Sequence, residues 1–71
     1  MGSTLKECPL TPRELAILEV VSEGGGSQRA AQILGGSPTT VQTHLQSIRA
    51  KLRVNTTTAA VAIALREGWI S

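Results

Sequence analysis

Apolar residues recur at helical spacing in four stretches of this chain, separated by breaks rich in glycine, serine or threonine. The first stretch consists of Leu15, Ile17, Leu18, Val20 and Val21. Thr11 before it can cap a helix, Pro12 suits the first helical position, and Glu14 can complete a capping box. Leu10 can pack against the first turn, and three glycines at 24–26 end the pattern. The pattern predicts a helix of about three turns starting at Pro12.

Two further helices are predicted between residues 27 and 53. Ser27 can cap a short one of about two turns, which ends at Gly35 and Gly36. Ser37 can cap a longer one, with Pro38 in its first position. Its apolar stripe advances in steps of four, three and four residues through Val41, Leu45, Ile48 and Leu52. We therefore expect this helix to run from about residue 38 to 53, with polar and basic side chains on its other face.

The last stretch, residues 59–65, contains only alanine, valine, isoleucine and leucine. Asn55 or one of the threonines at 56–58 can cap this helix, and Gly68 can end it. A helix with almost no polar face should be covered on more than one side, which a domain this small cannot do alone. The whole pattern predicts an all-α domain of four helices, the last of which is available for dimerisation.

Composition supports a small helical domain. The chain has 71 residues, with one tryptophan and no tyrosine or phenylalanine, which suits closely packed short helices better than a β-sandwich. A single cysteine and a single histidine cannot form an internal disulfide or a four-ligand zinc site, so we expect no metal or cofactor. The sequence shows neither a membrane span nor a signal peptide, and a cytoplasmic location is expected.

Charge is distributed unevenly. The first 23 residues hold four of the five glutamates, whereas residues 24–66 contain no acid. The basic residues of that second segment are Arg29, Arg49, Lys51, Arg53 and Arg66. This part of the chain can therefore face a polyanion.

The helices predicted at 27–34 and 38–53 have the order and lengths of a helix-turn-helix, in which the second helix enters the major groove of DNA. Gln42, Thr43 and Gln46 lie outward near the start of that second helix. Glutamine can bind adenine, and threonine can contact a base edge or a thymine methyl group. Candidate phosphate contacts are Ser37, Thr39, Thr40, the basic cluster Arg49, Lys51 and Arg53, and the threonines at 56–58.

Three segments, in this order and spacing, resemble the LuxR/GerE-type DNA-binding domain. They are Leu10–Glu14 (LTPRE), Thr40–Leu45 (TVQTHL) and Lys51–Val54 (KLRV). The resemblance extends from Leu10 to Ile70. It implies a DNA-binding domain at 10–71 after a flexible segment at 1–9, and it implies a bacterial transcriptional regulator that acts as a homodimer on duplex DNA, with the regulatory domain of such proteins upstream.

The resemblance also assigns residues. Base contacts fall on Gln42, Thr43 and Gln46. Phosphate contacts fall on Thr39, Thr40, Lys51 and the turn Asn55, Thr56 and Thr57. The dimer surface falls on the alanine-rich helix, where we expect Ala59, Ala62, Ile63 and Arg66 to take part.

The chain departs from the family pattern at two places where the change removes apolar side-chain volume from the core. Arg29, Ala30 and Ala31 stand where the family usually has Glu-Ile-Ala, and Gly36 replaces an apolar residue in the turn. Each change should cost roughly 1 kcal/mol or more if nothing compensates. Thr57 stands where arginine is frequent, and Gln42 and Gln46 stand where lysine is frequent, which favours base contacts over charge.

We expect no enzymatic activity, because the sequence shows no nucleophile with a base, no carboxylate pair and no cofactor loop. His44 has no partner histidine, cysteine or aspartate nearby in sequence and is expected to be structural or to lie near phosphate. The alternative to DNA binding is a protein-interaction domain that keeps the helix-turn-helix but uses its apolar fourth helix and its glutamines to bind another protein.

Overall fold

The computed structural model describes residues 8–71 and contains four helices in that range. They are α1 (Pro12–Ser22), α2 (Ser27–Leu34), α3 (Pro38–Leu52) and α4 (Thr57–Arg66). No strand occurs within residues 8–71. The predicted all-α class and the four predicted helices are confirmed. Of the segment predicted to be flexible, 1–9, residues 1–7 lie outside the described residues.

Three of the helix starts follow the sequence signals. Thr11 caps α1: its hydroxyl accepts from the backbone N–H of Glu14 at 3.1 Å, and the Glu14 carboxylate accepts from the N–H of Thr11 at 2.9 Å. Ser37 caps α3 in the same way, accepting from the N–H of Thr40 at 3.2 Å. Among the alternatives for α4, the cap is Thr56.

The predicted cap of α2 is wrong. Gly26 occupies the N-cap position without any side-chain hydrogen bond, and Ser27 is the first residue of the helix. The Ser27 hydroxyl instead accepts a hydrogen bond from the side-chain amide of Gln42 on α3. The local signal is displaced by one residue, because Gly26, with φ of −109° and ψ of −168°, has the extended conformation of an N-cap and Ser27 already belongs to the helix.

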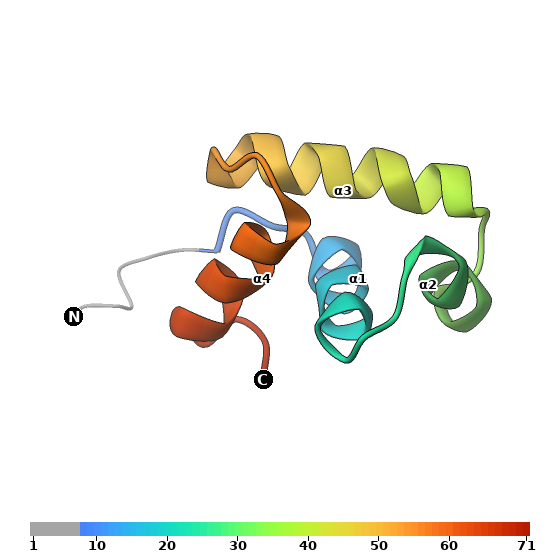
Figure 1. Ribbon diagram of the computed structural model, residues 1–71, viewed down its shortest axis with the longest axis horizontal. Coiled ribbons are helices and arrows are strands. Elements are labelled where there is room, and N and C mark those ends of the chain that lie inside the picture. Colours follow the sequence, from blue (N-terminus) through green and yellow to red (C-terminus); the bar gives the residue numbers. More distant parts are fainter. Residues whose placement is uncertain (1–7) are drawn as a thin grey trace.

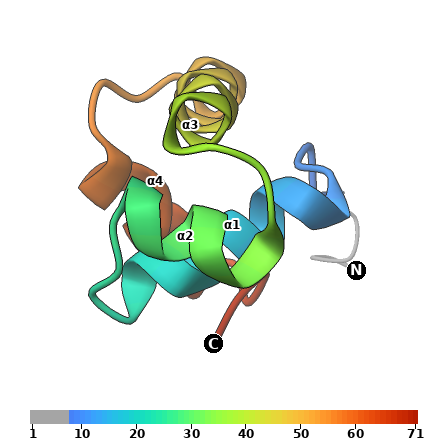
Figure 2. The ribbon, with the colours of Figure 1, turned by 90° about the vertical axis from the view of Figure 1, so that its right-hand side faces the viewer.

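The helices are arranged with α3 lying across the other three (Figure 1). Both α1 and α3 contact all the other helices, whereas α2 and α4 flank α1 and do not contact each other in the described part of the chain. The view along α3 shows it standing above α1, α2 and α4 (Figure 2). One long side of α3 is therefore left uncovered by the rest of the domain.

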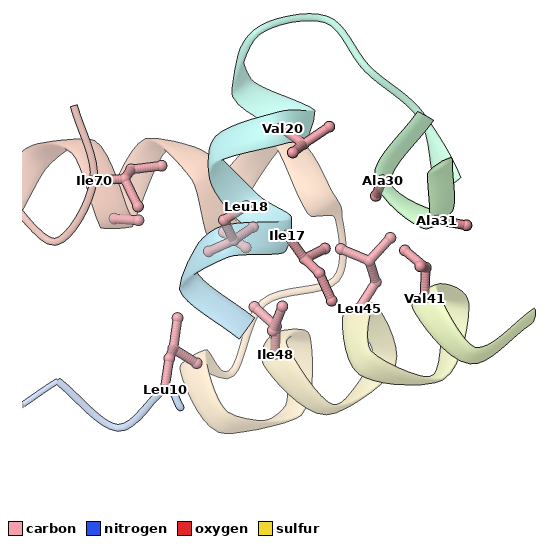
Figure 3. Close-up of a cluster of buried hydrophobic side chains, with 12 residues drawn as sticks. Leu10, Ile17, Leu18, Val20, Ala30, Ala31, Val41, Leu45, Ile48 and Ile70 are labelled. Atoms are coloured by element: carbon pink, nitrogen blue, oxygen red, sulfur yellow. The ribbon is translucent and has the colours of Figure 1, made fainter. Parts of the chain in front are cut away.

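The core is formed where α1 meets α3. Ile17, Leu18 and Ile48 are almost completely buried, with exposed fractions of 0–1%. In Figure 3 the side chains of Leu45 and Ile48 on α3 point toward those of α1. Small buried residues, Ala30 on α2 and Ala60 and Ala64 on α4, allow these helices to pack closely against the centre. Leu10, predicted to pack against the start of α1, is also buried in this cluster.

A buried carboxylate links α1 to α3. Glu14 is only 3% exposed, and its Oε1 lies 2.8 Å from Nζ of Lys51. Burial alone would raise the pKa of Glu14, but hydrogen bonds from Lys51, from the backbone of Thr11 and from Ser47 outweigh it and lower the pKa below its usual 4.5. The ionised form of Glu14 therefore stabilises the native fold.

The turn between α2 and α3 borders a pocket of about 260 Å³. Gly35 and Gly36 both have positive φ angles, +89° and +90°, which favour glycine over other residues. Across the pocket, Nη1 of Arg13 donates to the carbonyl of Leu34 at 2.8 Å and so ties the start of α1 to the end of α2. The missing side chain at Gly36 thus coincides with open space beside Ile17 and Val41.

Candidate nucleic-acid interface

The uncovered face of α3 carries the three residues predicted to contact bases. Gln42, Thr43 and Gln46 are all exposed, while Val41 just before them and Leu45 among them are buried. This alternation follows from the helical period, which turns neighbouring residues by about 100°. Two amides and one hydroxyl are therefore exposed on α3. One side of this helix is left uncovered by the other three (Figure 2).

Two of these side chains already have partners within the domain. The Nε2 group of Gln42 donates to the hydroxyl of Ser27 at the start of α2. The Thr43 hydroxyl donates to the carbonyl of Thr39, one turn earlier, at 3.2 Å. The proton of Thr43 is thus used within α3, which leaves its oxygen lone pairs and its methyl group for other contacts.

The first turn of α3 presents hydroxyl groups to solvent. Ser37, Thr39 and Thr40, predicted to contact phosphate, are all exposed. The hydroxyls of Ser37 and Thr40 lie 3.1 Å apart and are hydrogen-bonded. The positive end of the helix dipole adds to their suitability for an anion.

The other predicted phosphate contacts gather where α3 ends and α4 begins. Nη1 of Arg49 donates to the hydroxyl of Thr57 at 3.1 Å, which brings one cation to the N-terminus of α4. Asn55 and Thr56 in the connecting turn are exposed. Arg53 is also exposed and forms the left-handed C-cap of α3, with φ of 59°. The structure therefore places hydroxyl groups at the start of α3 and both hydroxyl and guanidinium groups at its end.

The residues near Lys51 in sequence include no acid, but in the folded protein Lys51 lies beside one. Its ammonium group lies 2.8 Å from Glu14, which is 37 positions earlier in the chain, and its side chain is 35% exposed. Only the packing of α1 on α3 brings the two charges together. The absence of acids between residues 24 and 66 is therefore a poor guide to the charge surrounding this lysine.

Of the four residues predicted to form the dimer surface, two are exposed and two are half-buried. Ala62 and Arg66 are exposed, whereas Ala59 and Ile63 are half-buried. Leu65, to which the sequence assigns no role, is 47% exposed on the same helix. As expected from its composition, α4 retains apolar surface that the domain does not cover.

His44, Cys8 and Trp69 have structural positions. His44 is half-buried and lines the pocket beside the α2–α3 turn together with Arg13. Cys8 is half-buried, and Trp69 packs against the core from the C-terminal side. Residues 8–71 contain no group of three histidine, cysteine or acidic side chains that could hold a metal ion. No helix in the same range is long and apolar enough to span a bilayer.

Comparison with known proteins shows which family this chain resembles. Residues 8–64 match the model of a family described as bacterial regulatory proteins, luxR family. The chain is 36% identical over 73 residues to the transcriptional regulatory protein MctR of Rhizobium johnstonii, with 100% of this chain and 34% of that protein covered. It is 40% identical over 71 residues to YdfI of Bacillus subtilis, a transcriptional regulatory protein of which it covers 33%.

A third relative is the transcriptional regulatory protein DegU of Brevibacillus brevis, 33% identical over 61 residues, covering 86% of this chain and 26% of that protein. The chain thus spans about a third of the length of the first two curated relatives. The matched segment includes α1, the helix-turn-helix formed by α2 and α3, and most of α4. Fold, motif and family match agree, and the chain belongs to the luxR family of bacterial regulatory proteins.

Proposed function

We propose that this chain binds duplex DNA in a sequence-specific manner, as the DNA-binding domain of a cytoplasmic bacterial transcriptional regulator, with α3 in the major groove. The observation that carries the proposal is that Gln42, Thr43 and Gln46 are exposed together on the second helix of a helix-turn-helix. A bare α-helix face of this kind fits the width of the major groove. Binding, without catalysis, is the proposed activity.

The chemistry of the exposed face suits base edges. Each glutamine can form a bidentate contact with adenine, and the methyl group of Thr43 can contact that of thymine. These side chains carry no charge, so their contribution is to discriminate between sequences. Affinity must come from other groups, because phosphate contacts supply most of it.

Phosphate contacts are proposed at both ends of α3. The hydroxyls of Ser37, Thr39 and Thr40 would contact the backbone at the start of the helix. At the other end, the contacts would come from Arg49, Lys51, Asn55, Thr56 and Thr57. Arg49 and Thr57 are already joined by a hydrogen bond, which holds the guanidinium group beside the N-terminus of α4. Lys51 would contribute less to phosphate binding than Arg49, since its ammonium group is already paired with the carboxylate of Glu14.

A homodimer on two half-sites about one helical turn of DNA apart is proposed, with contact through α4. The partly uncovered apolar surface of that helix, including Ala62 and Leu65, supports this arrangement. In the longer relatives, most of the protein lies outside the segment matched by this chain. We propose that the complete regulator has a regulatory domain upstream.

Selection of bound sequences from a random duplex DNA pool, at about 100 mM salt, tests the proposal. Enrichment of a two-fold symmetric motif would support both specific binding and dimeric docking. Failure to enrich any motif would refute sequence-specific binding and favour the alternative of a protein-interaction domain.

Gln46→Ala is expected to relax the preference at one or two base pairs of each half-site and to weaken binding to the best site by roughly 1 to 3 kcal/mol. Gln46 is exposed at the centre of α3, so its truncation should leave the fold intact. Binding curves on the selected site and on its single-base variants measure the effect. An unchanged order of preference among these variants would contradict the assignment of this face.

Ala62→Glu is expected to weaken dimerisation while the monomer stays folded, because Ala62 is exposed on α4 and a buried, unpaired carboxylate would be costly in an interface. Sedimentation equilibrium on a two-site duplex would show loss of the second bound copy at concentrations where the wild-type protein fills both sites. Gln32→Glu, an equally exposed change on α2, is the control. Equal cooperativity in all three proteins would exclude α4 as the dimer surface.

A further inference from the structure

Ser27 occupies an unexpected position in the helix-turn-helix. It is the first residue of α2, and its hydroxyl does not cap that helix, because Gly26 is the N-cap. The hydroxyl instead accepts a hydrogen bond from Nε2 of Gln42 on α3. The two residues are 15 positions apart, and Ser27 is half-buried while Gln42 is exposed. A side chain of the supporting helix thus holds a side chain on the exposed face of α3.

We infer that Ser27 is a positioning residue that fixes the orientation of the Gln42 amide and thereby determines which bases Gln42 accepts. The inference rests on the proposed function, since it concerns base recognition by the same face. It adds a residue that lies outside α3 and outside the three segments that carry the family resemblance.

The chemistry follows from which atom faces Ser27. Because Nε2 donates to the serine, the amide oxygen of Gln42 is turned away from it and remains available as an acceptor. In the major groove, adenine and cytosine offer amino donors, whereas guanine and thymine offer acceptors at the corresponding positions. The second proton of Nε2 can still donate to N7 of adenine, so adenine is the preferred partner, followed by cytosine.

Without this hydrogen bond, the amide can turn over and present its NH₂ group in place of its oxygen. An amide that turns freely is able to pair with donors or with acceptors, so it discriminates less sharply than one whose orientation is fixed. The side-chain amide of Gln46, one turn further along α3, has no hydrogen-bond partner among the described residues, which makes it an internal reference for an unheld glutamine. Positioning by Ser27 should therefore affect the base opposite Gln42 and leave that opposite Gln46 unchanged.

The test is selection of bound duplexes with the wild-type protein, Gln42→Ala, Ser27→Ala, Ser27→Thr and, as a matched control, Gln28→Ala on the exposed neighbouring position. Ser27→Ala removes no helix cap, so folding should be unaffected. We expect it to reduce the preference for adenine or cytosine over guanine or thymine about 5-fold at the one base pair that Gln42→Ala also affects. Ser27→Thr should keep the preference, because it keeps the hydroxyl.

The possible outcomes separate this inference from the proposed function. A wild-type protein that enriches no motif would overturn both. A wild-type motif that Gln42→Ala alters and Ser27→Ala leaves unchanged would overturn the role of Ser27 and leave the proposed function standing. Nitrogen-15 NMR of the free protein gives a readout without DNA: the Gln42 side-chain amide signals should move in Ser27→Ala and stay in Gln28→Ala. Unmoved signals would likewise overturn the inference.

Discussion

Replacing Glu14 with alanine is expected to lower the free energy of unfolding at pH 7 by about 3 kcal/mol. The substitution removes an almost fully buried carboxylate that accepts from Lys51 at 2.8 Å and from the backbone of Thr11 at 2.9 Å. Its loss opens the capping box of α1 and leaves the Lys51 ammonium without its partner. For a domain with a stability on the order of 5 kcal/mol, this is a large fraction.

Urea denaturation of the variant beside Glu19→Ala measures the effect, since Glu19 is on the same helix but exposed. The two substitutions are matched in helix propensity, so their difference reports the buried contacts. Equal stabilities, within about 0.5 kcal/mol, would show that the ion pair contributes nothing.

Comparison of the wild type with Glu14→Ala gives a pH dependence of stability whose sign is known. The pKa of Glu14 is lowered below 4.5 in the folded state, so its stabilisation is complete above that pH and is lost as the pH falls through the folded value. The difference between the wild type and Glu14→Ala should therefore shrink in acid below about pH 4.5. A difference that stays constant down to about pH 2.5 would assign the effect to packing instead of charge.

DNA affinity is expected to fall roughly a hundredfold between about 50 and 200 mM salt. Neutralisation of about four phosphates by cationic groups such as Arg49 and Arg53 would produce this slope through counterion release. A contact based on the apolar surface of α4 would respond little to salt. Binding curves on the selected duplex at four salt concentrations distinguish the two mechanisms.

Arg49→Gln provides the internal check. It should reduce the salt slope by about one phosphate equivalent and weaken binding to all sequences alike, because phosphate contacts carry no base information. Gln28→Ala again serves as an exposed control away from the cation. Affinity that stays within about threefold across the salt range would rule out phosphate contact as the source of binding.

The local features of this fold could be predicted from sequence because each depends on a few neighbouring residues. Thr11 with Glu14, Ser37 with Pro38, and the stripe Val41, Leu45 and Ile48 are enough to specify two helix starts and the buried side of α3. The exposed positions of Gln42, Thr43 and Gln46 follow from the same period. Each of these features depends only on residues within or next to a single helix.

Contacts between helices could not be predicted in this way. The sequence favours Ser27 as a cap and Lys51 as a cation far from any acid, yet Ser27 binds Gln42 and Lys51 binds Glu14. A hydroxyl or an ammonium has several possible partners, and the nearest in sequence is not the nearest in space once helices pack. The chain itself thus determined its four helices and the exposed face of α3, while tertiary packing decided which polar groups are already occupied, because only packing sets the distances across which they bond.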